Sequence, residues 1–305
     1  MAVTLSKLLA YVRSKEARRG QYRRMLWRNL HPFLDNVVLL GIGNGSEVIL
    51  TPSTERVLTG ALLAHGHFQK DNLQTALRIV ERHRLRMGGY FVDVGANIGS
   101  SSVYALNTSA FKHAVCIEPE PNNIRLLRAN LILNSLDKKA TVIEAAASAS
   151  EAELTLHLSK RNSGDHRAWP DPKWPRRAIQ VRGAPLDSLL RETGIEAAEV
   201  SLIWIDTQGY EGSVLAGASG ILSEQAPVVM EFWPWGLEQT GTLETCLGFL
   251  RQNFRYMYDL SEGSNATTRD VREIQDLAVE LGSRSNTAQT DLLFLNDRRS
   301  PSNSG

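Results

Sequence analysis

The stretch FVDVGANIG, residues 91–99, decides the fold of this 305-residue chain. A short apolar run ends at Asp93, a glycine-containing loop follows, and residues with helical spacing begin near Ser100. A strand that passes through such a loop into a helix is typical of an open α/β sheet, in which ligands bind outside the carboxyl ends of the strands. Gly95 and Gly99 allow the backbone to approach a ligand closely, because glycine carries no Cβ.

After Tyr90 the chain alternates short apolar runs with stretches of helical periodicity. This alternation predicts a parallel sheet with helices on both of its faces. Ile124, Leu127 and Leu131 mark one of the helices. The runs expected to form strands are 90–94, 114–117, 141–143, 201–205 and 227–230, with a last strand at 289–296.

Three further segments flank or interrupt this pattern. Residues 1–84 are expected to form an N-terminal extension with a basic helix, a β-hairpin and a helix over 71–87. Residues 85–297 are expected to form the α/β domain, with an insertion at 151–183. Residues 298–305 are expected to be a frayed tail. An insertion of this length beside the strand ends more often contributes to function than serves only as a connection.

The composition excludes several classes of protein. The 34 Lys and Arg residues balance 33 Asp and Glu residues, which argues against a dedicated nucleic-acid binder. Cys116 and Cys246 are the two cysteines, so a disulfide scaffold and a CxxC zinc site are excluded. There is no apolar run of about 18 residues and no signal-peptide pattern, so we expect a cytoplasmic protein.

The N-terminus is locally basic, with eight Lys and Arg residues and one acid, Glu16, in the first 30 positions. Leu5, Leu8 and Val12 recur beside these charges at helical spacing. One interpretation is an amphipathic helix that makes peripheral contact with an acidic membrane or a partner. The other is a helix that caps the domain and keeps its basic face in solvent.

The loop at 93–99 favours a particular cofactor. Its spacing, DxGxNxG, does not match the dinucleotide fingerprint GxGxxG, and the carboxylate of Asp93 would repel a pyrophosphate. That carboxylate suits a ligand end that carries an ammonium group, as S-adenosylmethionine does. In the stretch CIEPEPNN, Glu118 ends the next strand, where a carboxylate can accept hydrogen bonds from both ribose hydroxyls. We therefore expect S-adenosylmethionine to bind Asp93, Gly95, Asn97, Gly99 and Glu118.

The stretch IWIDTQGYEG, residues 203–212, places two further acids near the mouth of the sheet. Asp206 ends a buried strand, and Glu211 lies at the start of the following helix. Either could take a proton from an attacking hydroxyl or orient it. The alternative is that they stabilise the first turn of the helix, where acids are favoured.

Other candidates carry weaker signals. His166 lies in the insertion and is a candidate general base, because its unperturbed pKa is near neutrality. Glu231 ends another expected strand and could face the same crevice. His65 and His67 have no third ligand at a recognisable spacing, so no metal site is expected. Four tryptophans could form a stacking wall for an acceptor or could be packing residues: Trp169, Trp174, Trp233 and Trp235.

From about residue 60 to residue 296 the chain resembles the FkbM family of S-adenosylmethionine-dependent methyltransferases. The stretches that carry the resemblance are FVDVGANIG at 91–99, EPEPNNIRLLRANLILN at 118–134, LDSLL at 186–190 and IDTQGYEGSVLAGA at 205–218. The resemblance implies a Rossmann-like, seven-stranded methyltransferase sheet with the last strand antiparallel. It also implies O-methylation of a hydroxyl, often on a saccharide or natural product. The family commonly has Glu at the position of Gln208, and an amide cannot serve as a base, which favours Asp206, Glu211 or His166.

Two rival functions stay open. A nucleic-acid methyltransferase is one, but the chain has no (N/D/S)PP(Y/F) tetrapeptide, and neither cysteine follows a proline. The other is a cofactor-binding scaffold that performs no chemistry. The partner expected on these grounds is a small-molecule or glycan acceptor rather than a nucleic acid.

Overall fold

The computed structural model describes residue 25 and residues 38–42, 47–52, 55–160, 162–171 and 176–297. The expected basic helix, Trp174 and the tail at 298–305 lie outside the described residues. Within these ranges, no helix is both long enough and apolar enough to cross a membrane.

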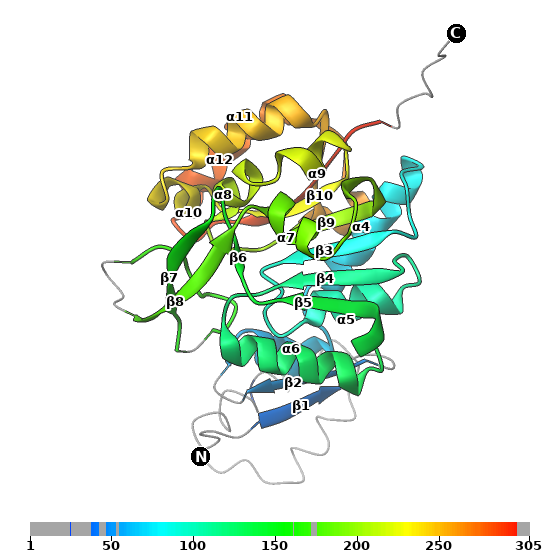
Figure 1. Cartoon of the computed structure of the whole chain (residues 1–305). Helices are drawn as coiled ribbons and strands as arrows, with labels where there is room; N and C mark the ends of the chain where they lie inside the picture. Colours follow the sequence, from blue (N-terminus) through cyan, green and yellow to red (C-terminus); the bar gives the residue numbers. More distant parts are fainter. Residues whose placement is uncertain are drawn as a thin grey trace.

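The core of the molecule is a mostly parallel sheet (Figure 1). Its strand order is β12-β11-β13-β10-β9-β3-β4-β5. The bounds are β3 Tyr90–Val94, β4 His113–Ile117, β5 Ala140–Ile143, β9 Val200–Ile205, β10 Val228–Phe232, β11 Tyr256–Asp259, β12 Arg269–Asp270 and β13 Thr290–Leu295. Five neighbouring strands of this sheet run parallel to one another: β5, β4, β3, β9 and β10. Strand β13 is antiparallel to both β10 and β11.

This topology confirms the expected class of sheet and the antiparallel last strand. The sheet contains eight strands rather than seven, because the two-residue strand β12 adds an edge beside β11. The six runs that were expected to be strands are all found, with bounds that differ from the expected ones by at most two residues. Strand β11 was not expected, since its four residues, YMYD, show no clear alternation of apolar and polar residues.

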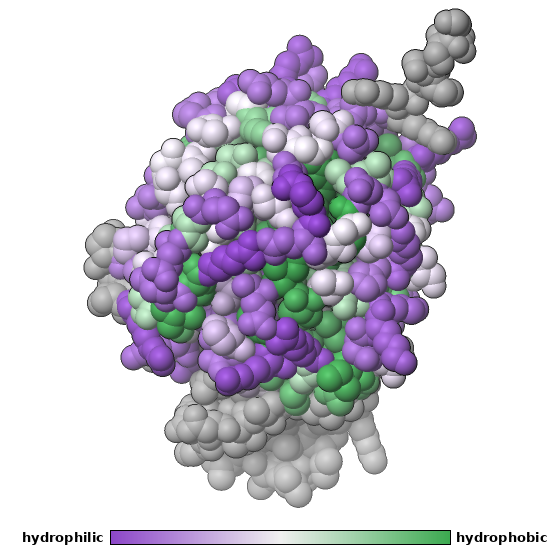
Figure 2. Space-filling model, viewed as in Figure 1, coloured by the Kyte–Doolittle hydropathy of each residue, from purple (hydrophilic) through white to green (hydrophobic). Residues whose placement is uncertain are grey.

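Successive side chains of each strand feed two hydrophobic clusters, one on each face of the sheet. Val92 and Ile203 pack on one face, and Phe91 and Trp204 pack on the other. The first face is covered by α7 Leu186–Glu192, α8 Glu211–Ala216, α9 Ser219–Ser223, α10 Pro234–Gln239, α11 Leu243–Asn253 and α12 Ile274–Arg284. The second is covered by α3 Leu58–His65, α4 Lys70–Arg82, α5 Ser100–Asn107 and α6 Pro121–Leu133. On the side shown in Figure 2, hydrophobic surface is limited to small patches between hydrophilic residues.

The expected N-terminal hairpin is present as β1 Val38–Ile42 and β2 Val48–Pro52, and it lies beside α6 (Figure 1). Two asparagine side chains, one in α6 and one directly after its last residue, form hydrogen bonds with the backbone of β2. Asn134 accepts from the Val48 N–H at 2.9 Å, and Asn130 accepts from the Leu50 N–H at 2.6 Å. Asn130 also donates to the Ile98 carbonyl at 2.8 Å. Asn130 of α6 thus links the extension to the 95–99 loop.

The helix that was expected over 71–87 ends earlier, at Arg82, since Arg84 adopts a left-handed φ of 54°. The insertion forms a hairpin of β7 Ala152–Leu158 and β8 Arg177–Ala184. Together with β6 Ala146–Ala147, this hairpin makes a separate three-stranded sheet that projects to one side of the molecule (Figure 1). Residues of the extension and of the α/β domain share the second hydrophobic cluster. The expected domain boundary near residue 84 stays a prediction.

Candidate active site

A cavity of about 320 Å³ opens at the carboxyl ends of β3, β4, β9 and β10. The N-terminal extension contributes Phe68 and Gln69 to its wall, and the insertion contributes Ser163 and His166. Segments that are distant in the sequence therefore enclose one space. This is the edge at which open α/β sheets bind ligands.

Asp93 is at the tip of β3 and lines the cavity with only 1% of its surface exposed. The Ser102 hydroxyl of α5 donates to its Oδ2 at 2.5 Å. Burial raises the pKa of Asp93 to about 7, and the nearby charge of Asp206 adds to the shift. A cation in the cavity would favour the ionised form of this carboxyl.

The glycines of the following loop serve different purposes. A Cβ at Gly95 would lie 2.0 Å from the Asp206 carbonyl oxygen, so only glycine allows the loop to pass so close to the end of β9. A Cβ at Gly99 would instead meet Leu127 Cδ1 at 2.3 Å. Gly99 begins α5 outside the described cavity wall and permits α5 to pack on α6. Asn97 lines the cavity, and its buried Oδ1 has no hydrogen-bond partner within the described protein.

Glu118 lies at the tip of β4 and fixes the same loop. Its Oε2 accepts from the Asn97 backbone N–H at 2.9 Å, and its Oε1 accepts from the Glu120 N–H at 2.9 Å. Asn123 donates to Oε1 at 3.3 Å. Burial raises the pKa of Glu118 to about 7. Both carboxylates that were expected at the cofactor therefore line one cavity.

Asp206, directly after β9, also lines the cavity, and Gln208 joins it to Glu231. The Gln208 amide donates to Asp206 Oδ1 at 2.6 Å and to Glu231 Oε2 at 2.8 Å. Burial raises the pKa of both acids, and for Glu231 the charge of Asp206 contributes further. Gln208 is thus not a base but a link that holds two carboxylates in the cavity wall.

Glu211, by contrast, is fully buried beneath the turn after β9 and is not part of the cavity wall. Its Oε1 accepts from the Thr207 N–H at 2.9 Å, the Thr207 hydroxyl at 3.0 Å and the Gly209 N–H at 3.2 Å. This geometry matches the alternative that Glu211 stabilises the start of α8.

His166 lines the cavity, but its environment does not favour a general base. Its Nδ1 accepts from the Ser159 backbone N–H at 3.0 Å, so the neutral ring carries its proton on Nε2. Burial lowers the pKa of His166 to about 4. The side chain is better suited to donate a hydrogen bond than to take a proton at neutral pH.

The extension and the insertion meet at the rim of the cavity. The carboxylate of Glu55, which is 2% exposed, accepts from the Ser163 backbone N–H and also from the N–H groups of Val57 and Leu58. Asn123 donates to the Ser163 carbonyl at 3.4 Å. The tip of the insertion is thereby held beside Glu118, and the buried Ser163 hydroxyl has no partner within the described protein.

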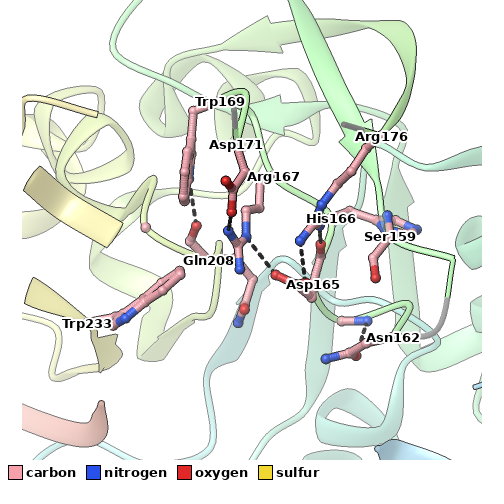
Figure 3. A network of polar contacts seen from close by, with 12 residues as sticks. Ser159, Asn162, Asp165, His166, Arg167, Trp169, Asp171, Arg176, Gln208 and Trp233 are labelled. Atoms are coloured by element: carbon pink, nitrogen blue, oxygen red, sulfur yellow. Dashed lines mark hydrogen bonds and ion pairs between the residues drawn. The ribbon is translucent and has the colours of Figure 1, made fainter. Parts of the chain in front are cut away.

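Trp169 and Trp233 pack in the interior of the described structure. Trp169 and Trp233 are 5% and 3% exposed, and their indole N–H groups donate to the carbonyls of Gln208 and Asn286. The Arg167 guanidinium lies 4.7 Å and 4.9 Å from their ring centres. Figure 3 shows Arg167 reaching toward Asp165 and Asp171 from this cluster. The cluster anchors the insertion to the turn after β9.

Several wall residues were not expected from the sequence: Gln69, Asn123, Ser163, Tyr210 and Gln289. Asn123 lies in the first turn of α6, Ser163 lies in the insertion, and Gln69, Tyr210 and Gln289 directly precede α4, α8 and β13. Only the tertiary fold brings these five side chains to one cavity. No cluster of His, Cys, Asp and Glu suited to a metal occurs in the described ranges.

The strand order and the loop after β3 define a Rossmann-like fold of the methyltransferase class. A family model described as the methyltransferase FkbM domain matches residues 93–257, more than half of the chain. The chain therefore belongs to the FkbM methyltransferase family.

The sequence identity between this chain and individual relatives is low. The chain is 29% identical over 156 residues to the 2-O-methyltransferase NoeI of Sinorhizobium fredii, a match that covers 46% of this chain and 62% of that protein. Among solved structures, methyltransferase FkbM from Methylobacillus flagellatus KT has a TM-score of 0.43 and 15% identity, covering 90% of this chain and 59% of that chain. Precorrin-6y C5,15-methyltransferase from Geobacter metallireducens GS-15 has a TM-score of 0.38 and 11% identity, covering 74% and 87%.

Proposed function

We propose that this protein transfers a methyl group from S-adenosylmethionine to a hydroxyl of a saccharide or natural product. The observation that carries the proposal is the single cavity shared by Asp93 and Glu118, each at the tip of a neighbouring strand. Membership of the FkbM family supports methyl transfer. The name of the NoeI relative, a 2-O-methyltransferase, supports a hydroxyl acceptor.

The residues present fit this cofactor. Asp93 and Glu118 offer buried carboxylates to a cationic ligand, and the wall contains no Lys or Arg within the described ranges. The unpartnered Asn97 Oδ1 and Ser163 hydroxyl supply further polar atoms that a nucleoside would satisfy. Leaving such buried groups without a partner costs free energy, so a polar ligand is favoured here.

Four acidic residues of the wall have parts in the proposed reaction. When bound, the cofactor supplies an electrophilic methyl group attached to a sulfonium sulfur. Asp93 would hold the ammonium end, and Glu118 would accept hydrogen bonds from the ribose. Asp206 or Glu231 would orient the acceptor hydroxyl toward that methyl group and receive the hydroxyl proton. Holding the reactants in line contributes most of the acceleration.

The transfer is tested with the purified protein, a methyl-labelled donor and a cell extract as the source of acceptor. We expect a labelled product that survives mild alkali, because a methyl ether is stable where a methyl ester is hydrolysed. Label that is lost in alkali, or that is found on an amine, would contradict O-methylation of a hydroxyl. Protein that neither binds the donor in a calorimetric titration nor produces label would contradict the proposed function as a whole.

Ser163→Ala is expected to weaken S-adenosylmethionine binding by about threefold to tenfold, the usual worth of one hydrogen bond. The reason is that the buried Ser163 hydroxyl has no hydrogen-bond partner among the described residues and lies at the cofactor side of the cavity. The matched control is Ser223→Ala, whose hydroxyl donates to the Gly220 carbonyl outside the cavity wall. Equal dissociation constants for the two variants would remove Ser163 from the cofactor site.

A further inference from the structure

Five side chains on the wall of the cavity form one continuous hydrogen-bonded row, which we term the amide–carboxylate row. Gln208 donates to Asp206 and Glu231, as described above. Gln289 donates to Glu231 Oε1 at 2.6 Å, and Gln69 approaches Asp206 Oδ2 at 3.4 Å. All five residues line the cavity. They come from the loop before α4, the turn after β9, the tip of β10 and the residue before β13.

The row leaves hydrogen-bond acceptors free. Each of the four carboxylate oxygens of Asp206 and Glu231 receives one amide N–H, and a carboxylate oxygen can accept more than one hydrogen bond. The amides also fix the two carboxylates in place, so little side-chain freedom is lost when a ligand binds. Several hydroxyl groups on one ligand would therefore find fixed acceptors along this wall.

The same wall has no positive charge to offset the two acids. In the described part of the chain, no Lys or Arg lines the cavity. Three basic residues of the adjoining segments are already paired. Arg167 pairs with Asp165 and Asp171, and Arg176 pairs with Asp165 (Figure 3). Lys70 pairs with Glu47. His166 is held in its neutral form by the Ser159 N–H. An anionic group placed here would add a further acid beside Asp206 and Glu231, whose pKa values burial already raises, with no Lys or Arg among the described lining residues to offset it.

We propose that the amide–carboxylate row is the acceptor subsite and that it selects a sugar ring bearing several hydroxyls and no acidic group. This inference rests on the proposed function and adds to it the charge of the acceptor. A uronate or a sugar phosphate is excluded by repulsion from Asp206 and Glu231, because such repulsion is weakly screened in a partly enclosed site. A neutral ring donates its hydroxyls to the same two carboxylates.

The test uses three pools of small probes at equal concentration with a methyl-labelled donor. One pool holds neutral methyl glycosides, one the corresponding methyl glycosiduronates and one the corresponding 6-phosphates. We expect label in the neutral pool at a rate at least tenfold above either acidic pool. Equal or faster labelling of an acidic pool would overturn the charge selection.

Failure of this inference is distinguishable from failure of the proposed function. If no pool is labelled although calorimetry shows that the donor binds, the saccharide subsite is overturned and the cofactor site stands. If the donor itself does not bind, the proposed function fails. Binding of S-adenosylhomocysteine, measured without any acceptor, separates these two outcomes.

Glu231→Gln tests the row itself. Replacing the acid of Glu231 by a neutral amide is expected to narrow the ratio of neutral to acidic labelling at least threefold, while the affinity for S-adenosylhomocysteine stays within twofold of the wild type. The matched control, Glu224→Gln, makes the same change at an exposed position outside this cavity and should leave the ratio unchanged. A loss of labelling that is proportional in all pools, with the ratio of neutral to acidic labelling unchanged, would overturn the part of Glu231 in charge selection.

Discussion

Asp93→Asn is expected to weaken S-adenosylmethionine binding by about hundredfold or more at pH 7.5. Asp93 is 1% exposed and lines a cavity wall that has no Lys or Arg among the described residues. Removing one partner of a buried charge pair costs about 3–5 kcal/mol, which corresponds to at least two orders of magnitude in affinity. The Ser102 hydroxyl can still donate to the amide oxygen of the substituted side chain, so we expect the fold to be retained.

The measurement is a calorimetric titration, with the circular dichroism spectrum and the denaturation midpoint recorded in parallel. Asp276→Asn, an exposed substitution on α12, is the matched control and should bind as the wild type does. A folded Asp93→Asn variant with wild-type affinity would remove Asp93 from the cofactor site.

The same carboxyl should make wild-type binding depend on pH. Burial raises the pKa of Asp93 to about 7, and the cation binds the ionised form, so affinity falls as pH drops through that value. One carboxyl with this pKa weakens binding roughly 20-fold between pH 7.5 and pH 5.5. Glu118, whose pKa is also raised to about 7, adds to the effect. The dependence should therefore be shallower, but not absent, in Asp93→Asn.

Gly95→Ala is expected to lower the free energy of unfolding by about 2–5 kcal/mol and to abolish detectable donor binding. Gly95 has a φ of +82°, and an added Cβ would lie 2.0 Å from the Asp206 carbonyl oxygen. The clash is with backbone, so either the loop or the end of β9 must move. Both form the cavity wall, and stability and binding should be lost together.

Gly194→Ala is the matched control for this substitution. Gly194 has a φ of +73° but no heavy atom within 4 Å of the added Cβ, so it carries the backbone cost without the clash. We expect a loss of about 1 kcal/mol and unchanged donor binding. Urea denaturation and calorimetry measure both effects. If the two alanine variants are equally stable, the close approach of Gly95 to β9 does not constrain the loop.

The local motifs predicted which residues lie at the strand tips, because each motif contains the strand, the turn and the start of the helix in one short stretch. FVDVGANIG contains a strand, a turn and a helix start, and the structure places Asp93 and Glu118 in one cavity as adjacent parallel strands require. The sequence could not decide between Asp206 and Glu211, since both acids follow the same strand. The fold separates them: Asp206 lines the cavity, and Glu211 turns inward to bind N–H groups at residues 207 and 209.

The rest of the wall depends on contacts between distant segments. Gln69 and Gln289 reach Asp206 and Glu231 only because the extension and the last strand pack around the sheet. His166 looked suited to proton transfer by residue type, but burial lowers its pKa to about 4. Such environmental effects have no signature in a single sequence.

The central claim is that Asp93 and Glu118 hold the two ends of one nucleoside cofactor. A crystal structure of the complex with S-adenosylhomocysteine tests it most directly. We expect the amino group within hydrogen-bond distance of Asp93 and the ribose hydroxyls within hydrogen-bond distance of Glu118. A nucleoside bound elsewhere, or bound in this cavity without contact to either carboxylate, would contradict the account.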